Sequence, residues 1–323
     1  MKQILPLNPA TYQRHQIHAA ERNWAETNCY VDVWVELLHA LGHEPIAALA
    51  FTLAIDFEGD QWTFFKFDHS ELYELYGLDV QELAIWRPLT EHLEEQVDRG
   101  RHVLVELDSY YLPDTAGAAY QREHVKTTVA VNAIDVGKRV MGYFHNQSYH
   151  HVQGDDFLKI FRLDQPCDPS RLAPFCEFVK QSDRLSLAGD ALVPASLGLL
   201  RARLQRLPKF NPFVPFKKRL EADLAWLSGA DLAAFHQYSF ATLRQFGAAF
   251  ELAATYFHWL KRNNVKQTDE PIAAFQELST LAKTLQFHLA RTVTRKKPLD
   301  TSVVDKMAMC WEDAQTNLRA KFQ

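Results

Sequence analysis

The chain of 323 residues is 47% hydrophobic, 23% charged and 12% aromatic, with a formal net charge of −5. This balance is typical of a globular protein with a sizeable core, and it excludes disordered, collagen-like and coiled-coil chains. No apolar run reaches the roughly 18 residues that a membrane-spanning helix needs, and Met1–Tyr12 does not resemble a secretory signal. The four cysteines include no C-x-x-C pair, so we expect a reducing, cytoplasmic environment without disulfides.

Charge and histidine are distributed unevenly along the chain. Residues 1–164 contain 13 Lys and Arg against 25 Asp and Glu, a net charge of −12, whereas residues 165–323 contain 22 against 15, a net charge of +7. Eleven of the 14 histidines also lie in the first half. This division indicates two parts with different electrostatic roles, or simply two domains of opposite charge that attract each other.

The first strong helix is predicted at Asn28–Leu41, where valines and leucines recur at near-helical spacing before Gly42. The stretch after this helix stays apolar, and Gln61–Phe67 has the composition of a strand. Ser70–Tyr76 is predicted to be a second helix. These elements place helical structure at the beginning of the chain.

A sheet is predicted to follow. Asp79–Arg99 reads as a helix that is interrupted at Pro88. Arg101–Leu107 is short, aliphatic and β-branched, which is typical of a buried strand. Val125–Ile134 and Arg139–Phe144 are separated by a short turn sequence and predict a β-hairpin.

The pattern changes after residue 164. Gln165–Pro174 contains three prolines and reads as a linker. No strand signal follows it, and five later stretches show the apolar stripes of helices, namely Ala195–Leu207, Lys217–Leu227, Asp231–Arg262, Ile272–Thr292 and Val303–Phe322. We therefore predict an α+β domain over residues 1–165 and an all-α helical domain over residues 166–323.

Cys29 is the candidate nucleophile. It stands at the start of the first helix, directly after Asn28, which is a favourable N-cap residue. The positive end of the helix dipole lowers the pKa of a thiol in the first turn and favours the reactive thiolate. The alternative is a small buried apolar residue, the usual role of a free cysteine.

A cysteine nucleophile also needs a histidine base and a residue that orients the imidazole, and both have candidates later in the sequence. His124 directly precedes a predicted strand, and the partner strand of the hairpin ends at His145 and Asn146. The hairpin places Asn146 near the same end of the ladder as His124, whereas Asp135 lies 11 residues away at the turn, about 35 Å at roughly 3.3 Å per residue. His145 is the weaker choice, because adjacent strand residues point to opposite faces.

Two motifs carry a resemblance to known families. A D-x-Y-Y-L-P stretch, here Asp108–Pro113, precedes the histidine strand His124–Val131. With the helix-start cysteine, this layout resembles papain-like cysteine enzymes, in particular the amino-terminal domain of the butirosin biosynthesis protein H family. Nearly the whole chain is also similar to a bacterial family known only as a domain of unknown function, in which the motifs N-C-Y-V-D-x-W and Y-L-P-D-T-x-G recur; here these are Asn28–Trp34 and Tyr111–Gly117.

The butirosin family moves an aminoacyl group from the phosphopantetheine thioester of a carrier protein to an amine through a cysteine. The resemblance therefore implies a papain-like fold in which Cys29 is the nucleophile, His124 the acid and base, and Asn146 the orienting residue. It further implies Asn23, six residues before the cysteine, as an oxyanion donor beside the Cys29 backbone N–H. A polar loop residue without such a role is the alternative reading of Asn23.

Two further groups are assigned in this scheme. Tyr110 and Tyr111 are candidates for lining an acyl pocket, or are half-buried loop aromatics. The stretch Arg201–Arg219 holds seven Lys and Arg and no acid, so it is the candidate docking surface for an acidic carrier protein. The residues assigned to docking are Arg201, Arg203, Lys217, Lys218 and Arg219. A solvated loop is the alternative, and the overall pI of about 6.3 argues against nucleic acid.

The sequence thus favours a cysteine-dependent acyltransferase that takes an acyl or aminoacyl group from a carrier protein to a small-molecule amine or thiol. Phosphopantetheine would arrive on the carrier protein, and we expect no bound cofactor, metal, membrane or nucleic acid. His150, His151, Asp155 and Asp156 lack the spacing of a closed zinc site. A hydrolase using the same cysteine and a non-catalytic binding protein are the alternatives.

Overall fold

The computed structural model describes residues 2–18, 22–166 and 172–322. Two compact units make up the chain, and each is formed from segments that are discontinuous in sequence. Unit 1 consists of Met1–Ala20, Asn28–Pro45 and Asp68–Leu187, and unit 2 consists of Glu21–Thr27, Ile46–Phe67 and Ala188–Gln323.

Unit 1 is built on an antiparallel sheet, which has seven strands among the described residues. The order across the sheet is β2-β7-β3-β4-β5-β6, and β1 pairs with the end of β4. The strands are β1 (Lys2–Gln3), β2 (Leu78–Glu82), β3 (His102–Asp108), β4 (Lys126–Asp135), β5 (Val140–His145), β6 (Ser148–Gln153) and β7 (Cys176–Gln181). Strand β4 is therefore central, with β3 on one side and β5 on the other.

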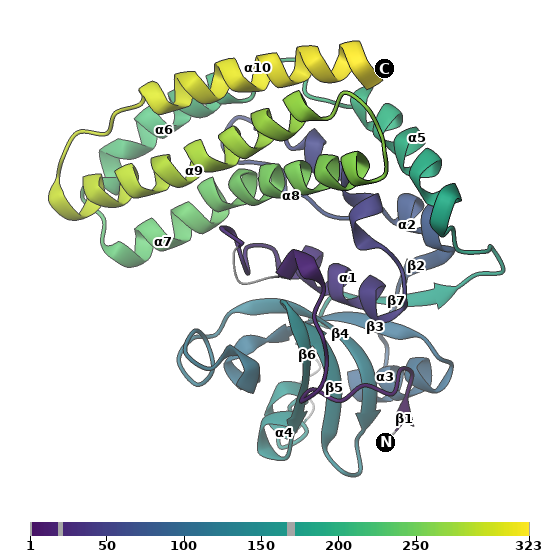
Figure 1. Cartoon of the computed structure of the whole chain (residues 1–323). Helices are drawn as coiled ribbons and strands as arrows, with labels where there is room; N and C mark the ends of the chain where they lie inside the picture. Colours follow the sequence, from purple (N-terminus) through teal and green to yellow (C-terminus); the bar gives the residue numbers. More distant parts are fainter. Residues whose placement is uncertain (1, 19–21, 167–171, 323) are drawn as a thin grey trace. The chain divides into compact units, whose positions relative to one another are not determined.

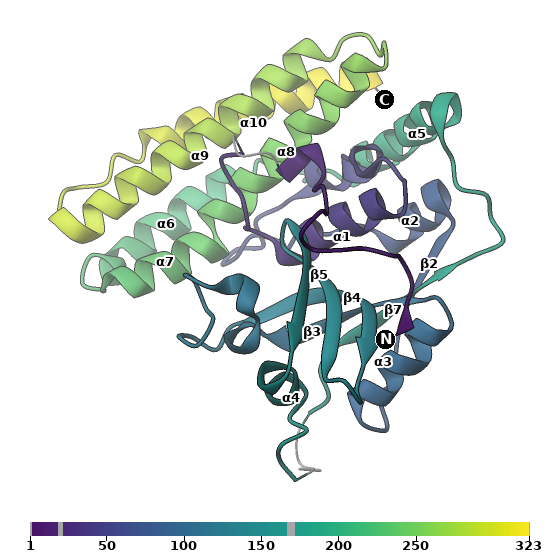
Figure 2. The same cartoon turned by 60° about the horizontal axis from the view of Figure 1, so that its bottom comes forward.

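Four α-helices accompany the sheet of unit 1. They are α1 (Cys29–Ala40), α2 (His69–Tyr76), α3 (Leu89–Asp98) and α4 (Asp155–Phe161). Helix α1 packs across β4, β5 and β6, and α3 packs against β3 and β4. Figures 1 and 2 show α1 on one face of the sheet and α3 on the other. The face under α1 is the one that matters for the candidate site.

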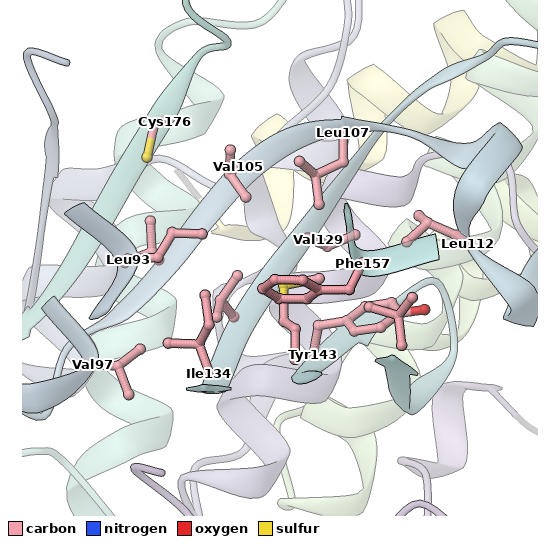
Figure 3. Close-up of a cluster of buried hydrophobic side chains, with 14 residues drawn as sticks. Leu93, Val97, Val105, Leu107, Leu112, Val129, Ile134, Tyr143, Phe157 and Cys176 are labelled. Atoms are coloured by element: carbon pink, nitrogen blue, oxygen red, sulfur yellow. The ribbon is translucent and has the colours of Figure 1, made fainter. Parts of the chain in front are cut away.

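The core of unit 1 on the α3 side is a continuous apolar cluster. Figure 3 shows Leu93 and Val97 from α3 and Phe157 from α4 against the strand side chains. Because strand residues alternate between faces, Val105 and Leu107 of β3 point into this cluster, and Glu106 between them points to the opposite face of the sheet.

Unit 2 is almost entirely helical. Its α-helices are α5 (Leu192–Leu204), α6 (Phe213–Leu227), α7 (Leu232–Ala241), α8 (Leu243–Arg262), α9 (Asp269–Arg295) and α10 (Ser302–Phe322). Helix α9 packs against α8 and α10, and Figure 1 shows these three long helices side by side. None of the helices in the described ranges combines the length and the apolar character needed to cross a membrane.

Aromatic rings fill the core of unit 2. Trp62, from the segment that precedes α2 in the chain, lies with its ring centroid 5.3 Å from that of Phe213, 5.4 Å from that of Phe216 and 4.7 Å from that of Phe246. All four side chains are buried. The segment Ile46–Phe67 therefore belongs to the helical unit, although it lies early in the sequence.

Most of the predicted elements are confirmed. The first helix, the hairpin of β4 and β5, the strand β3 and the helices of the C-terminal part all occur close to their expected positions. The fold is mixed α and β, with helices concentrated in the C-terminal part. The predicted helix Asp231–Arg262 is two helices, since it is broken at Thr242, where the backbone leaves the helical region with φ −118° and ψ −84°.

Three local predictions are wrong. The part of Asp79–Arg99 before Pro88 is not helical, because Leu78–Glu82 forms strand β2, whereas the part after Pro88 is helical as predicted. Gln61–Phe67 forms no strand beyond a single bridge between Phe57 and Trp62. The predicted absence of strands after residue 164 is also wrong, because β7 lies between β2 and β3.

The unit boundaries differ from the predicted division between residues 165 and 166. Glu21–Thr27 and Ile46–Phe67 group with the helices of unit 2, whereas β7 belongs to the sheet of unit 1. The physical reason is that Trp24 and Trp62 find their buried partners in unit 2, and no local pattern in the sequence reports such long-range packing.

The contact between Trp24 and Gly247 of α8 gives a stability prediction. A Cβ atom added at Gly247 would lie 2.5 Å from two ring atoms of Trp24, which is buried and donates its indole N–H to Ser279 Oγ at 2.8 Å. Gly247→Ala should therefore lower the free energy of unfolding by about 1–3 kcal/mol, because overpacking outweighs the helix propensity of alanine.

The matched control is Gly198 of α5, where an added Cβ meets no atom within 4 Å. Gly198→Ala should be neutral or should stabilise the protein by about 0.5–1 kcal/mol. Chemical denaturation followed by circular dichroism measures both variants. Equal stability of the two variants would contradict the packing argument.

Candidate functional site

Cys29 is the first residue of α1, as predicted. The side chain of Asn28 caps the helix by accepting a hydrogen bond from Val31 N at 3.1 Å. Cys29 is half-buried and forms no disulfide. Burial raises the pKa of the Cys176 thiol to about 12 and that of the Cys310 thiol to about 11. Cys167 lies outside the described residues. Of the three described cysteines, Cys29 is the one that stands at the start of an α-helix, where the helix dipole favours a thiolate.

His124 has a carboxylate partner, and that partner is Asp108. The distance between His124 Nδ1 and Asp108 Oδ2 is 2.6 Å. The second oxygen, Asp108 Oδ1, accepts the backbone N–H of Tyr110 at 3.0 Å, so both oxygens of this carboxylate are held in place. The side chain of His124 is 65% exposed and that of Asp108 is 28% exposed, which leaves the imidazole open to a substrate.

Two tyrosines of the Y-Y-L-P stretch enclose the His124 ring. Tyr110 stacks on it with a centroid distance of 4.3 Å and an interplanar angle of 10°, and Tyr111 meets it edge-on at 6.1 Å. Both tyrosines belong to the short 3₁₀ turn Ser109–Tyr111. Their predicted role in an acyl pocket stays a prediction, but their position beside the imidazole is now defined.

Asn146 is not the observed partner of His124. It occupies the tight turn between β5 and β6 with a left-handed backbone (φ 49°). The partner of His124 lies at the end of β3, the other neighbour of β4, and not on the β5 side of the hairpin where Asn146 was expected. Asp135 is confirmed as a turn residue, since its carboxylate accepts the backbone N–H of Lys138 at 2.9 Å.

The loop that carries His124 is anchored by a buried carboxylate that the sequence analysis did not single out. Asp114, in the Y-L-P-D-T-x-G motif, accepts a hydrogen bond from Tyr143 OH and pairs with His145 Nδ1. Burial alone would raise the pKa of Asp114, but the hydrogen bond and charge of His145 hold it below its ordinary value. Thr115 Oγ1 donates to Ser109 O at 3.0 Å and ties the loop to itself. These bonds explain the D-T part of the motif.

The start of α1 and Asp108 lie on the same face of the sheet. Val105 and Leu107 point into the core on the α3 side, so Leu104 and Asp108 lie on the opposite face, which α1 covers over β4, β5 and β6. Glu177 of β7 lies directly opposite Leu104 and shares its face. Tyr30, the residue after Cys29, donates its hydroxyl to Glu177 Oε2 at 2.8 Å, which fixes the first turn of α1 over this part of the sheet.

Asn23 belongs to unit 2, whereas Cys29 belongs to unit 1. The backbone N–H of Asn23 donates to Glu251 Oε1 at 2.8 Å, and its carbonyl oxygen accepts from Lys283 Nζ at 3.2 Å. Its side chain is exposed. These contacts hold the backbone of Asn23 to Glu251 of α8 and Lys283 of α9 in unit 2. The role of its side chain as an oxyanion donor stays a prediction.

The basic stretch Arg201–Arg219 is not a continuous exposed loop. Phe213 and Phe216 are fully buried in the core of unit 2. Lys217 Nζ lies within 2.8 Å of both Asp305 oxygens, and Arg219 Nε lies 2.9 Å from Asp223 Oδ1. Among the assigned docking residues, Arg201, Lys218 and the paired Arg219 are exposed, and Arg203 and the paired Lys217 are half-buried. The positive surface is therefore smaller than the composition indicates.

The residues weighed as metal ligands have other partners. Asp156 Oδ2 accepts from Tyr120 OH at 2.8 Å, and His150 Nε2 lies 4.0 Å from Asp114 Oδ2. Within the part of the chain that the structure describes, no group of three or more His, Cys, Asp or Glu side chains is arranged to hold a metal ion.

The comparisons with known proteins address the whole chain. No curated protein matches it. The model of the DUF1839 N-terminal domain matches residues 13–181, and that of the DUF1839 C-terminal domain matches residues 189–320. The two matches follow one another and leave only seven residues, 182–188, between them. The chain therefore belongs to the DUF1839 family.

Proposed function

We propose that the protein is a cysteine-dependent acyltransferase of papain-like chemistry, in which Cys29 carries an acyl group from a thioester to an amine. The observation that carries the proposal is the Asp108–His124 pair: an exposed imidazole with one nitrogen fixed by a carboxylate and the ring held by Tyr110. An orienting acid, a base and a cysteine at a helix start are the parts that nucleophilic catalysis needs.

The proposed first step is acylation of Cys29. His124 Nε2 takes the thiol proton, and the sulfur attacks the thioester carbonyl carbon. As the tetrahedral intermediate collapses, the C–S bond to the donor breaks, and the imidazolium returns the proton to the departing thiolate. Asp108 stabilises the imidazolium, which an asparagine at this place would do less well. The Cys29 backbone N–H, at the start of α1, is the proposed oxyanion donor.

The proposed second step is transfer of the acyl group. An amine attacks the acyl-enzyme, a C–N bond forms and the C–S bond to Cys29 breaks, while the proton that the amine loses passes through His124 to the Cys29 thiolate. The donor is proposed to be the phosphopantetheine thioester of an acidic carrier protein, with Arg201 and Lys218 as exposed docking charges. A reducing, cytoplasmic setting is part of the proposal, because a thiol nucleophile must stay reduced.

Hydrolysis is the second candidate function. The 65% exposure of the His124 side chain favours it, because water reaches the base directly. Exclusion of water from the acyl-enzyme separates a transferase from a hydrolase. The ratio of amide to free acid formed from an acyl N-acetylcysteamine thioester in the presence of an amine distinguishes the two functions.

The site itself is tested by acyl-enzyme formation with acetyl-N-acetylcysteamine, measured by intact mass and peptide mapping. The acyl group should appear on Cys29. His124→Ala should slow its appearance by about 10²–10⁴-fold, the usual contribution of a positioned base. Asp108→Asn should slow it by a smaller factor, because it removes the charge but keeps the shape.

Asn146→Gly is the matched control for Asp108→Asn, since glycine accepts the left-handed backbone of this turn (φ 49°). It should leave the acylation rate as it is. Iodoacetamide should also label Cys29 before Cys176 and Cys310, because burial raises the pKa values of those two thiols to about 12 and about 11. Acylation of another cysteine, or a slow Asn146→Gly variant with a normal Asp108→Asn variant, would refute the assignment.

The docking charges give a separate prediction. Reversal of Arg201 and Lys218 to Glu should slow acyl transfer from a loaded acyl carrier protein by roughly tenfold at low salt. The effect should fade with added salt, because the Debye length falls from ~10 Å at 0.1 M to ~3 Å at 1 M. The N-acetylcysteamine thioester has no acidic surface and should be used equally by both forms. Equal use of the carrier protein would remove these residues as a docking site.

A further inference from the structure

Unit 1 contains a second histidine backed by a carboxylate, which the proposed mechanism does not use. His69, the first residue of α2, places Nε2 3.3 Å from Glu177 Oε1 and 2.9 Å from Tyr30 OH. Glu177 and Tyr30 are buried, with 3% and 8% of their surfaces exposed, whereas the side chain of His69 is 31% exposed. A partly open imidazole thus stands in front of a buried carboxylate and phenol.

The hydrogen bonds fix which nitrogen of His69 carries the proton. Tyr30 donates its single hydroxyl proton to Glu177 Oε2 at 2.8 Å. Burial, followed by the charge of Glu177, raises the pKa of Tyr30 well above its ordinary value, so the phenol stays protonated. The Tyr30 oxygen and Glu177 Oε1 can then only accept from His69, which requires the proton on Nε2.

The lone pair of neutral His69 consequently lies on Nδ1. In the described ranges no hydrogen bond to His69 Nδ1 occurs. A fixed tautomer, a free basic nitrogen and a carboxylate behind the ring are the features of a general base. His124 has the same construction with its nitrogens exchanged, since its Nδ1 is bound to Asp108.

Tyr30 links His69 and Glu177 to the proposed nucleophile, Cys29. Tyr30, which binds His69, directly follows Cys29 in α1. Glu177 lies opposite Leu104 on β3, four residues before Asp108 on the same strand and the same face. Both carboxylate-backed histidines therefore flank the face of the sheet on which α1 begins.

Building on the proposed acyl transfer, we propose that His69 is the base that deprotonates the acceptor, and that the acceptor is a primary ammonium compound. His69 Nδ1 takes one proton from the R–NH₃⁺ group, and the neutral amine attacks the acyl carbon of Cys29. The C–N bond forms, the C–S bond breaks, and the second amine proton goes to the Cys29 thiolate by way of His124. The negative charge of Glu177 favours both the approach of the cation and the His69 imidazolium that results.

The test compares two amines on the full chain, with acetyl-N-acetylcysteamine as donor. Ethanolamine is protonated at neutral pH, whereas methoxyamine is not and needs no base for its first proton. His69→Gln should lower the ratio of the ethanolamine rate to the methoxyamine rate by about 100-fold, the lower range of a general base contribution. His236→Gln, at an exposed histidine of α7, is the matched control and should keep the wild-type ratio.

The outcomes separate this proposal from the one on which it rests. Equal slowing with both amines would give His69 a structural role and overturn the inference, while dependence on Cys29 persisted. Turnover of both amines by Cys29→Ala at the wild-type rate would instead overturn the proposed function. Nitrogen NMR of the unsubstituted chain supplies a readout without activity: the Nε2–H tautomer of His69 is expected, and the Nδ1–H tautomer would refute the assignment.

Discussion

The buried carboxylate of Asp114 holds the candidate site in place. It joins the connection between β3 and β4 to two side chains of β5, Tyr143 and His145. A connection of this length would sample many conformations, because the entropy of an untied loop is large. His124 is held beside Asp108 by the bond from its Nδ1 and by ring contacts with Tyr110 and Tyr111, and the Asp114 anchor restrains the connection that carries Tyr110, Tyr111 and His124.

The acidic character of the first half of the chain has a local explanation. Several of its carboxylates pair with histidines, since Asp108 and Asp114 each hold one ring nitrogen of a partner. A further pair of acids, Asp32 and Glu36 of α1, encloses the fully buried His18. Part of the acid in residues 1–164 therefore serves as partner to the histidines that are concentrated in the same part of the chain. Unit 1 thus contains several histidines whose ring nitrogens are held by carboxylates, and their side chains differ in exposure to solvent.

Local signals in the sequence were sufficient for the helix start at Cys29 and for the strands β3, β4 and β5, because capping residues and β-branched runs act over a few positions. These local signals could not identify the residue that orients His124. Strand β4 has two neighbours, and the choice of Asp108 over Asn146 depends on β3, whose pairing with β4 spans a connection rather than a tight turn. The pairing of Glu177 with the start of α1 depends on β7, a six-residue strand after a proline-rich segment that gave no periodic signal.

Both units are formed from segments that are discontinuous in sequence, and this limits where the chain can be cut. The chain passes between unit 1 and unit 2 at five points, and α1 is flanked on both sides by segments of unit 2. Trp62 packs on Phe213, Phe216 and Phe246, which lie more than 150 residues later in the chain. A chain cut before α5 would keep every strand of the sheet but would leave Trp62 without these rings and expose apolar surface. A cut before α5 would therefore remove the rings that bury Trp62, a residue of the segment that follows α1 in the chain.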